Sequence, residues 1–221
     1  MTRAAFEQQL AEVQEEMLVL AGLVDAAIQR SIQALRERDA SLAHQVVAED
    51  VLVNQKRYEI EETCLELIAT QQPLAGDLRT IVAVLFIAGE LERMGDHAEG
   101  IAKIAIMGGD EPPLRPLADI PLMAEIARRM LVSAIDAFKD RDSQRARKIC
   151  DEDDEVDTLY EQVYRELIGH IIEDPATTDR ATHLTWVAHN LERIADRVTN
   201  ICERVVYLVE GRIQELNVSK Y

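Results

Sequence analysis

Aromatic residues, glycine, proline and cysteine are all scarce in this sequence of 221 residues. Phe, Trp and Tyr together make up 4% of it, and there are nine Gly, six Pro and three Cys. Hydrophobic residues still reach 48%, so Leu, Ile, Val and Ala must fill the core. This composition is typical of a helical bundle and predicts an all-α protein.

Other absences exclude classes of function and location. No run of about 18 apolar residues occurs, so we expect no transmembrane segment. The start, Met1-Thr2-Arg3, lacks the apolar stretch of a signal peptide. Cys64, Cys150 and Cys202 are odd in number and lie in apolar-periodic segments, which predicts buried, reduced thiols in a cytoplasmic protein. No phosphate-cradling Gly loop, nucleophile elbow or Cys-x-x-Cys is present, so the sequence gives no support for a phosphotransferase or hydrolase.

The charge is strongly one-sided. Asp and Glu number 41 against 24 Lys and Arg, which gives a formal net charge of −17. Nucleic acids and anionic lipid surfaces are therefore poor partners by long-range electrostatics. Cations, or a basic patch on another protein, are better ones.

Apolar periodicity divides the chain into six long helices, three in each half. We expect them at about residues 2–38, 41–70, 77–107, 120–139, 143–172 and 179–216, with Asp39 or Ser41 capping the second. The only stretch rich in Gly and Pro is 108–116. The predicted fold is two tandem, pseudo-symmetric three-helix bundles: residues 1–107, a linker over 108–118, and residues 119–221.

An internal repeat relates the two halves. Glu92-Arg93-Met94-Gly95-Asp96 returns 100 positions later as Glu192-Arg193-Ile194-Ala195-Asp196. At this spacing each pair of carboxylates lies one turn apart on one helix face. Gly89, Gly95 and Gly100, on the third helix, are expected to allow close helix approach.

A second polar pair lies on the partner helix of each half. Asp50 and Asn54 correspond to Asp153 and Asp157, which come 103 positions later. Residues equidistant from a turn lie side by side in an antiparallel hairpin. Asp50 with Asp96 and Asn54 with Glu92 both centre on position 73. Asp153 with Asp196 and Asp157 with Glu192 both centre on 174.5.

Each hairpin should therefore gather four oxygen-bearing side chains at one level. Clustered carboxylates repel one another unless a proton or a cation neutralises them, and bundle proteins hold hard cations and iron with such ligands. The predicted metal ligands are Asp50, Asn54, Glu92, Asp96, Asp153, Asp157, Glu192 and Asp196. The alternative is a solvated face on which these acids pair with Arg57, Arg93, Lys103, Arg193 or Arg197.

The sequence also resembles the PhoU family of bacterial phosphate-uptake regulators over nearly its whole length. The likeness rests on three segments: 71–79 (QQPLAGDLR), 91–96 (LERMGD) and 190–196 (NLERIAD). It implies two three-helix bundles, a cytoplasmic and often dimeric protein, and multinuclear iron or other metal clusters held at acidic motifs. Asn54 departs from that pattern, since an amide is a weaker ligand than a carboxylate.

The resemblance also implies a function in signalling rather than catalysis. Such proteins restrain the phosphate-starvation response when phosphate is plentiful. They act between the ATPase subunit of the phosphate ABC transporter and a sensor histidine kinase, and reach the inner face of the membrane only through these partners. Two alternatives stay open. One is a carboxylate-bridged metalloenzyme, disfavoured because no Glu-x-x-His pair occurs, and the other is a purely structural helical adaptor.

Overall fold

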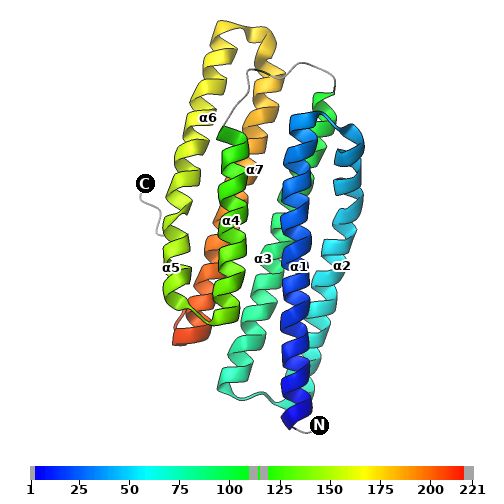
Figure 1. Ribbon diagram of the computed structural model, residues 1–221, viewed down its shortest axis with the longest axis vertical. Coiled ribbons are helices and arrows are strands. Elements are labelled where there is room, and N and C mark those ends of the chain that lie inside the picture. Colours follow the sequence, from blue (N-terminus) through cyan, green and yellow to red (C-terminus); the bar gives the residue numbers. More distant parts are fainter. Residues whose placement is uncertain (1–2, 110–113, 115–118, 217–221) are drawn as a thin grey trace.

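The computed structural model describes residues 3–109, 114 and 119–216, and every regular element in these ranges is helical. Three helices precede α4 along the chain and four elements follow it, as the order of colours in Figure 1 shows. Their bounds are α1 Arg3–Glu37, α2 Ala40–Gln71, α3 Ala75–Gly108, α4 Asp119–Asp140, α5 Ser143–Asp151, α6 Asp153–Glu173, the 3-10 turn η1 Pro175–Thr177, and α7 Thr178–Glu210.

The helices form two antiparallel bundles side by side (Figure 1). The first contains α1, α2 and α3, and the second contains α4, α7 and the consecutive helices α5 and α6. Helices α3 and α7 pack against each other and join the two bundles. The predicted fold class, two pseudo-symmetric three-helix bundles, is confirmed.

The same short connection joins the first two helices of each bundle. Arg38 and Arg141 both adopt a left-handed conformation, with φ of 56° and 52°. The following Asp39 and Asp142 then cap the next helix, accepting hydrogen bonds from the backbone N–H of Leu42 and Arg145 at 2.9 Å. A cap of this kind satisfies one of the free N–H groups of the first turn. Asp39, not Ser41, is the capping residue of α2.

Two helix ends differ from the expectation. The segment 143–172 is not one helix, because it breaks at Glu152 into α5 and α6. An acidic run starts there, and a new helix places Asp153, Asp154 and Glu155 in its first turn, where the helix dipole favours negative charge. The last helix ends at Glu210 rather than near 216, because Gly211 adopts φ of 72° and terminates it.

One hydrophobic core runs through both bundles, from Phe6 on α1 to Leu208 on α7. Leu, Ile, Val, Ala and Met side chains fill it, and aromatic residues contribute little, as the composition predicts. The largest fully buried side chains include Met17, Ile87 and Met130, which come from three different helices. All three cysteines are buried and free, as expected for reduced thiols. Burial raises the pKa of the Cys64 thiol to about 12.

Most of the predicted linker, 108–118, lies outside the described residues, so the domain boundaries 1–107 and 119–221 stay a prediction. Within the described ranges, one helix is long and apolar enough to cross a membrane by length and composition alone. It is α1, with an 18-residue window of mean hydropathy 1.3. A single such helix near the N-terminus is weak evidence, because the core helices of helical bundles pass the same test. Met17, Leu20, Val24 and Ile28 of α1 are fully buried in the bundle.

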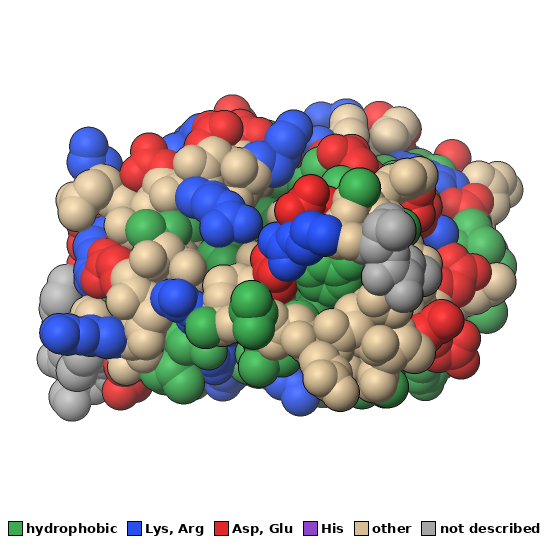
Figure 2. Space-filling model, turned by 90° about the horizontal axis from the view of Figure 1, so that it is seen from below, with side chains coloured by type: hydrophobic (Ala, Val, Ile, Leu, Met, Phe, Trp, Pro, Cys, Tyr) green, Lys and Arg blue, Asp and Glu red, His purple; other side chains and the backbone are tan. Residues whose placement is uncertain are grey.

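Acidic side chains do not predominate at the end of the molecule that holds the α2–α3 connection, although the net charge of the whole protein is −17. Seen from this end, Lys and Arg side chains alternate with Asp and Glu around exposed hydrophobic groups (Figure 2). Leu74, at the start of α3, and Ile213, just beyond α7, are among the most exposed large hydrophobic residues, at 75% and 73%.

Candidate functional site

The α2–α3 hairpin places Asp50 beside the repeated motif of α3. Gln72 turns the chain in a left-handed conformation before Pro73, so α2 and α3 run back along each other. A Cβ atom at Gly95 would lie 3.0 Å from Cγ1 of Val53 and 3.6 Å from Oδ1 of Asp50. The absence of a side chain at Gly95 thus lets α2 approach closely. The prediction for Gly95 is confirmed, whereas Gly89 has no neighbour within 4 Å of such an atom.

The carboxylates of this first acidic cluster interact electrostatically. Burial raises the pKa of Asp50, and the charges of Glu99 and Asp96 raise it further. Burial also raises the pKa of Glu92, and Asp96 and Asp50 add to the shift. The hairpin therefore brings Asp50, Glu92 and Asp96 together, as the position arithmetic predicts. The amide nitrogen of Asn54 donates a hydrogen bond to Oδ2 of Asp50 at 2.6 Å, so Asn54 supports that carboxylate.

The second acidic cluster lies between α6 and α7. Burial raises the pKa of Asp157, followed by the charge of Asp196. Glu192 is shifted most: burial and then Asp196 raise its pKa to about 7, with a smaller contribution from Asp157. Asp157, Glu192 and Asp196 are therefore neighbours. Asp153 begins α6 and is 2% exposed.

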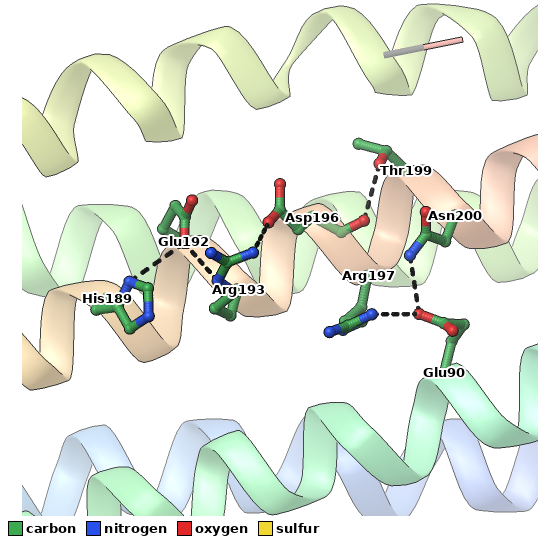
Figure 3. A network of polar contacts seen from close by, with 8 residues as sticks. All are labelled: Glu90, His189, Glu192, Arg193, Asp196, Arg197, Thr199 and Asn200. Atoms are coloured by element: carbon green, nitrogen blue, oxygen red, sulfur yellow. Dashed lines mark hydrogen bonds and ion pairs between the residues drawn. The ribbon is translucent and has the colours of Figure 1, made fainter. Parts of the chain in front are cut away.

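Basic side chains only partly compensate the second cluster (Figure 3). Arg193 donates a hydrogen bond to Oδ2 of Asp196 at 3.1 Å. Oε2 of Glu192 lies 3.5 Å from Nε of Arg193 and 3.6 Å from Nδ1 of His189. The contact with Arg193 is an ion pair, whereas burial lowers the pKa of His189 and so disfavours its charged form. Neither contact gives that buried oxygen a hydrogen bond. Pairing with arginine, the alternative to metal binding, is thus realised for Asp196 and incompletely for Glu192.

A buried carboxylate oxygen without a hydrogen bond and with a raised pKa is a favourable place for a cation. Across residues 3–109, 114 and 119–216, however, no three His, Cys, Asp or Glu side chains converge closely enough to hold one ion. The two clusters therefore have the ligand chemistry of a cation site without a preassembled coordination sphere. Metal binding by the eight residues stays a prediction.

A further polar network joins the two bundles, and its centre is Glu90 (Figure 3). This residue of α3 is 4% exposed. Its Oε2 accepts hydrogen bonds from Nδ2 of Asn200 at 3.0 Å and from Nη1 of Arg197 at 3.4 Å, both on α7. Arg93 of the same helix contacts Oε1 at 3.4 Å. Glu90 is thus a buried carboxylate that ties α3 to α7.

The symmetry-related contact between α7 and α3, formed by the counterparts of these residues, joins uncharged side chains. The counterpart of Glu90, 100 positions later, is Asn190, and its Oδ1 lies 2.9 Å from Nδ1 of His97, the counterpart of Arg197. The amide nitrogen of Asn190 donates to the carbonyl of Trp186, so Nδ1 of His97 carries the proton that it shares with Oδ1. A Cβ at Gly100, the counterpart of Asn200, would lie 3.3 Å from Oδ1 of Asn190. The prediction of close approach is confirmed for Gly100.

Sequence reasoning missed Glu90 and Glu99. Glu99 acts on Asp50 and forms an ion pair with Lys103 at 2.6 Å. It follows Asp96 by three positions on the same helix face, a signal that was available. The repeat criterion hid it, because its counterpart is Thr199. Glu90 was hidden for the same reason, since its counterpart Asn190 carries no charge.

A family model described as "PhoU domain" matches residues 17–105 and 120–205, one match in each bundle. The chain belongs to the PhoU family. The phosphate-specific transport system accessory protein PhoU homolog of Aquifex aeolicus (strain VF5) is 41% identical over 93% of each chain. The homolog of the same name from Clostridium acetobutylicum is 35% identical over 98% of this chain and the whole of that one.

Solved PhoU structures share the fold. The crystal structure of PhoU from Pseudomonas aeruginosa superposes with a TM-score of 0.89 at 34% identity, covering 94% of this chain and 100% of that one. The phosphate transport system regulatory protein PhoU from Streptococcus pneumoniae gives 0.88 at 31% identity, over 95% and 99%. This chain is therefore a PhoU protein over both bundles.

Proposed function

We propose that this PhoU protein regulates phosphate uptake and restrains the phosphate-starvation response without being an enzyme. The observation that carries the proposal is the match of both bundles to the PhoU domain, together with relatives named as accessory proteins of phosphate-specific transport. In this proposal the protein is cytoplasmic. It acts between the ATPase subunit of a phosphate ABC transporter and a sensor histidine kinase, reaches the inner face of the membrane through these partners, and forms a homodimer.

A chromosomal deletion tests the regulatory role. Cells that lack the protein should express a phosphate-starvation reporter, such as alkaline phosphatase, in medium with ample phosphate. Restoring the wild-type gene should repress it again. An unchanged reporter in the deletion strain would contradict the proposed role.

The partners are tested separately. Affinity purification from cells grown at high phosphate should recover the transporter ATPase subunit and the sensor kinase at higher yield than an unrelated helical protein of similar acidity. Recovery of neither partner, with the reporter still derepressed in the deletion strain, would place the protein elsewhere in the response. Sedimentation velocity of the purified protein tests the dimer.

The proposed function includes cation binding at the two acidic clusters. Asp157, Glu192 and Asp196 would hold a cation, iron or another hard ion, in the second bundle, and Asp50, Glu92 and Asp96 would do so in the first. The bound cation would supply positive charge that neutralises the clustered carboxylates and stabilises the bundles. The raised pKa values of Glu192, Asp157, Asp50 and Glu92, and the buried Oε2 of Glu192, support this assignment.

Metal content distinguishes this assignment from the alternatives. Glu192→Gln with Asp196→Asn should lower the iron-to-protein ratio after iron loading and gel filtration, as measured by elemental analysis. Glu166→Gln with Glu173→Gln, at exposed positions of α6, removes the same charge and should leave the ratio unchanged. Equal loss in both variants would mean that only net charge attracts the metal. An oxidase assay on the loaded protein tests the metalloenzyme alternative.

A further inference from the structure

Helix α6 carries a row of large apolar and aromatic side chains, three of which face solvent. Tyr160, Tyr164, Ile168 and Ile172 follow one another at four-residue intervals, and so lie along one face of the helix. Tyr164 is 47% exposed, Ile168 38% and Ile172 76%. We call these four residues the α6 ridge. Helix α6 packs on α4, α5 and α7 and forms an outer edge of the molecule (Figure 1). On this edge Tyr164, Ile168 and Ile172 stay exposed, whereas Tyr160 is half-buried against the core.

Helix α7 extends this surface. The ring of Tyr160 lies 6.2 Å from that of His189, which places the neighbouring face of α7 beside the ridge. Trp186, one turn before His189, is 48% exposed and contacts His183 with ring centroids 5.6 Å apart. Trp186 and Tyr164 are nearly equidistant from the η1 turn, so they stand at the same level of the hairpin. The only Trp of the chain and two of its five Tyr thus gather on one surface.

The surface is also hollowed. An open hollow of about 360 Å³ is lined by Tyr160, Glu161, Tyr164 and Arg165. Exposed aromatic side chains such as Tyr164, and hollows that a partner side chain can fill, contribute much of the binding energy in protein interfaces. Tyr164, Ile168 and Ile172 are exposed and lie outside the buried core, so their apolar side chains are not explained by folding.

The first bundle provides an internal comparison. The residues of α2 that correspond to Tyr160, Tyr164 and Ile172, 103 positions earlier, are Arg57, Glu61 and Ala69. Arg57 and Glu61 form an ion pair at 2.8 Å, as on an ordinary solvated helix face. Only Leu65, opposite Ile168, keeps a large apolar side chain. The equivalent face of the first bundle therefore carries an ion pair where the second bundle carries the aromatic residues of the ridge.

The charged residues of α6 indicate which kind of partner surface would bind to the ridge. Helix α6 contains seven acidic residues and one basic residue. That basic residue, Arg165, is paired with Glu161 at 2.6 Å and so contributes little net positive charge. An apolar ridge bordered by negative charge complements an amphipathic helix with an apolar face and basic flanks.

We propose that the α6 ridge, with Trp186 of α7, is the docking surface for a basic amphipathic helix of a partner protein. The proposal rests on the proposed function only in that a regulator requires a partner, and it does not depend on cation binding. It assigns partner recognition to one side of the second bundle and leaves the equivalent face of the first bundle in water.

Trp186 provides a direct measurement, because it is the only Trp of the chain. The probe is an 18-residue helical peptide of Leu and Lys, and the control peptide carries Glu in place of Lys. The Leu–Lys peptide should shift the emission of Trp186 to shorter wavelength in a saturable titration, whereas the Leu–Glu peptide should not. Tyr164→Ser and Ile172→Ser should each weaken binding at least tenfold. Tyr58→Ser, at a 55% exposed position of α2, is the matched control and should leave the affinity unchanged.

Equal affinity of the Tyr164→Ser and Tyr58→Ser proteins for the Leu–Lys peptide would overturn the proposal, because general attraction between opposite charges would then explain binding. Circular dichroism and thermal melting should be unchanged in all three variants, since the substituted side chains are exposed.

Cross-linking in cells identifies the occupant. A photoreactive phenylalanine at position 164 should form a product with another protein through a basic helical segment, and the same group at position 58 should not. A product with a second copy of this chain, or no product at position 164, would overturn the proposal. The deletion phenotype remains an independent readout, so failure of docking at the ridge leaves the regulatory role standing.

Discussion

Individual carboxylates in this protein differ widely in the free-energy cost of remaining ionised in the folded state. Glu90 is buried but has three partners, whereas Glu192 is partly buried and has an oxygen without a hydrogen bond. A buried charge with good partners is tolerated, and one with poor partners binds a proton or a cation instead. The two residues should therefore respond in opposite ways to neutralisation.

Neutralising Glu192 should stabilise the protein at high pH. Its folded-state pKa is about 7 against an ordinary value of 4.5, so the folded protein binds more protons between these pH values. Stability conferred by its protonation is complete below about pH 4.5 and is lost as the pH rises through 7. In the presence of a chelator, Glu192→Gln should gain about 1–2 kcal/mol over wild type at pH 8.5, after allowance for partial screening by solvent.

Urea unfolding of both proteins at pH 5 and pH 8.5 measures this gain. The difference in unfolding free energy should be small at pH 5 and grow with pH. A constant difference across this range would mean that the carboxyl of Glu192 titrates normally.

Removing Glu90 should have the opposite effect. Glu90→Ala leaves Arg197 and Asn200 on α7 without their shared acceptor, and should cost about 3 kcal/mol in unfolding free energy. Glu7→Ala breaks the exposed Arg3–Glu7 pair, with both side chains more than half exposed, and should change little. Chemical denaturation of the three proteins provides the test, and similar stabilities for both variants would show that the α3–α7 contact is not held by this carboxylate.

At the scale of helices, Gly95 and Gly100 of α3 lie where α2 and α7 approach closely, and Gly89 does not. An added Cβ at Gly95 meets Val53 of α2, whereas one at Gly89 meets nothing within 4 Å. The role of a helical glycine therefore depends on which face of the helix it occupies. The sequence alone does not show which glycine of α3 faces a neighbouring helix.

This contrast predicts different outcomes for the same substitution. Gly89→Ala should stabilise the protein by about 0.5–1 kcal/mol, because alanine favours the helix. Gly95→Ala gains the same propensity but pushes Val53 away, so it should be at least about 1 kcal/mol less stable than Gly89→Ala. Thermal melts of the two variants compare them directly. Equal stabilisation would mean that α2 can move away from α3 without loss.

Much of this element level follows from the sequence. Periodicity predicts the helices, Asp39 and Asp142 cap where Arg-Asp punctuates the pattern, and the hairpin arithmetic correctly brings Asp50 to Asp96 and Asp157 to Glu192. The break at Glu152 was missed, because like charges at a helix start and within a helix look alike in sequence. Glu90 and Glu99 were missed because their counterparts in the second half, Asn190 and Thr199, carry no charge. In addition, the direction in which a helix side chain points depends on tertiary packing.

At the scale of the whole molecule, one core and one buried polar network join the two bundles. Buried residues of α3, such as Ile87 and Met94, belong to the same core as Ile194 and Val198 of α7. A shared core of this kind favours cooperative unfolding of the two bundles.

We therefore expect a single unfolding transition. Differential scanning calorimetry should give one peak with equal calorimetric and van't Hoff enthalpies. Ile194→Ala, at a fully buried position, should lower that one transition by about 2–5 kcal/mol in unfolding free energy rather than split it. Two resolved peaks, only one of which responds to Ile194→Ala, would show that the bundles unfold separately.

The polar pairs across α3 and α7 have one more consequence. Position 90 meets positions 197 and 200, and position 190 meets 97 and 100, which is the pattern of contacts across the axis of a two-subunit assembly. Two identical subunits must carry the same residues at both crossings. A chain that contains both copies is free of that constraint, so one crossing can be ionic and the other neutral, and each can change without altering the other.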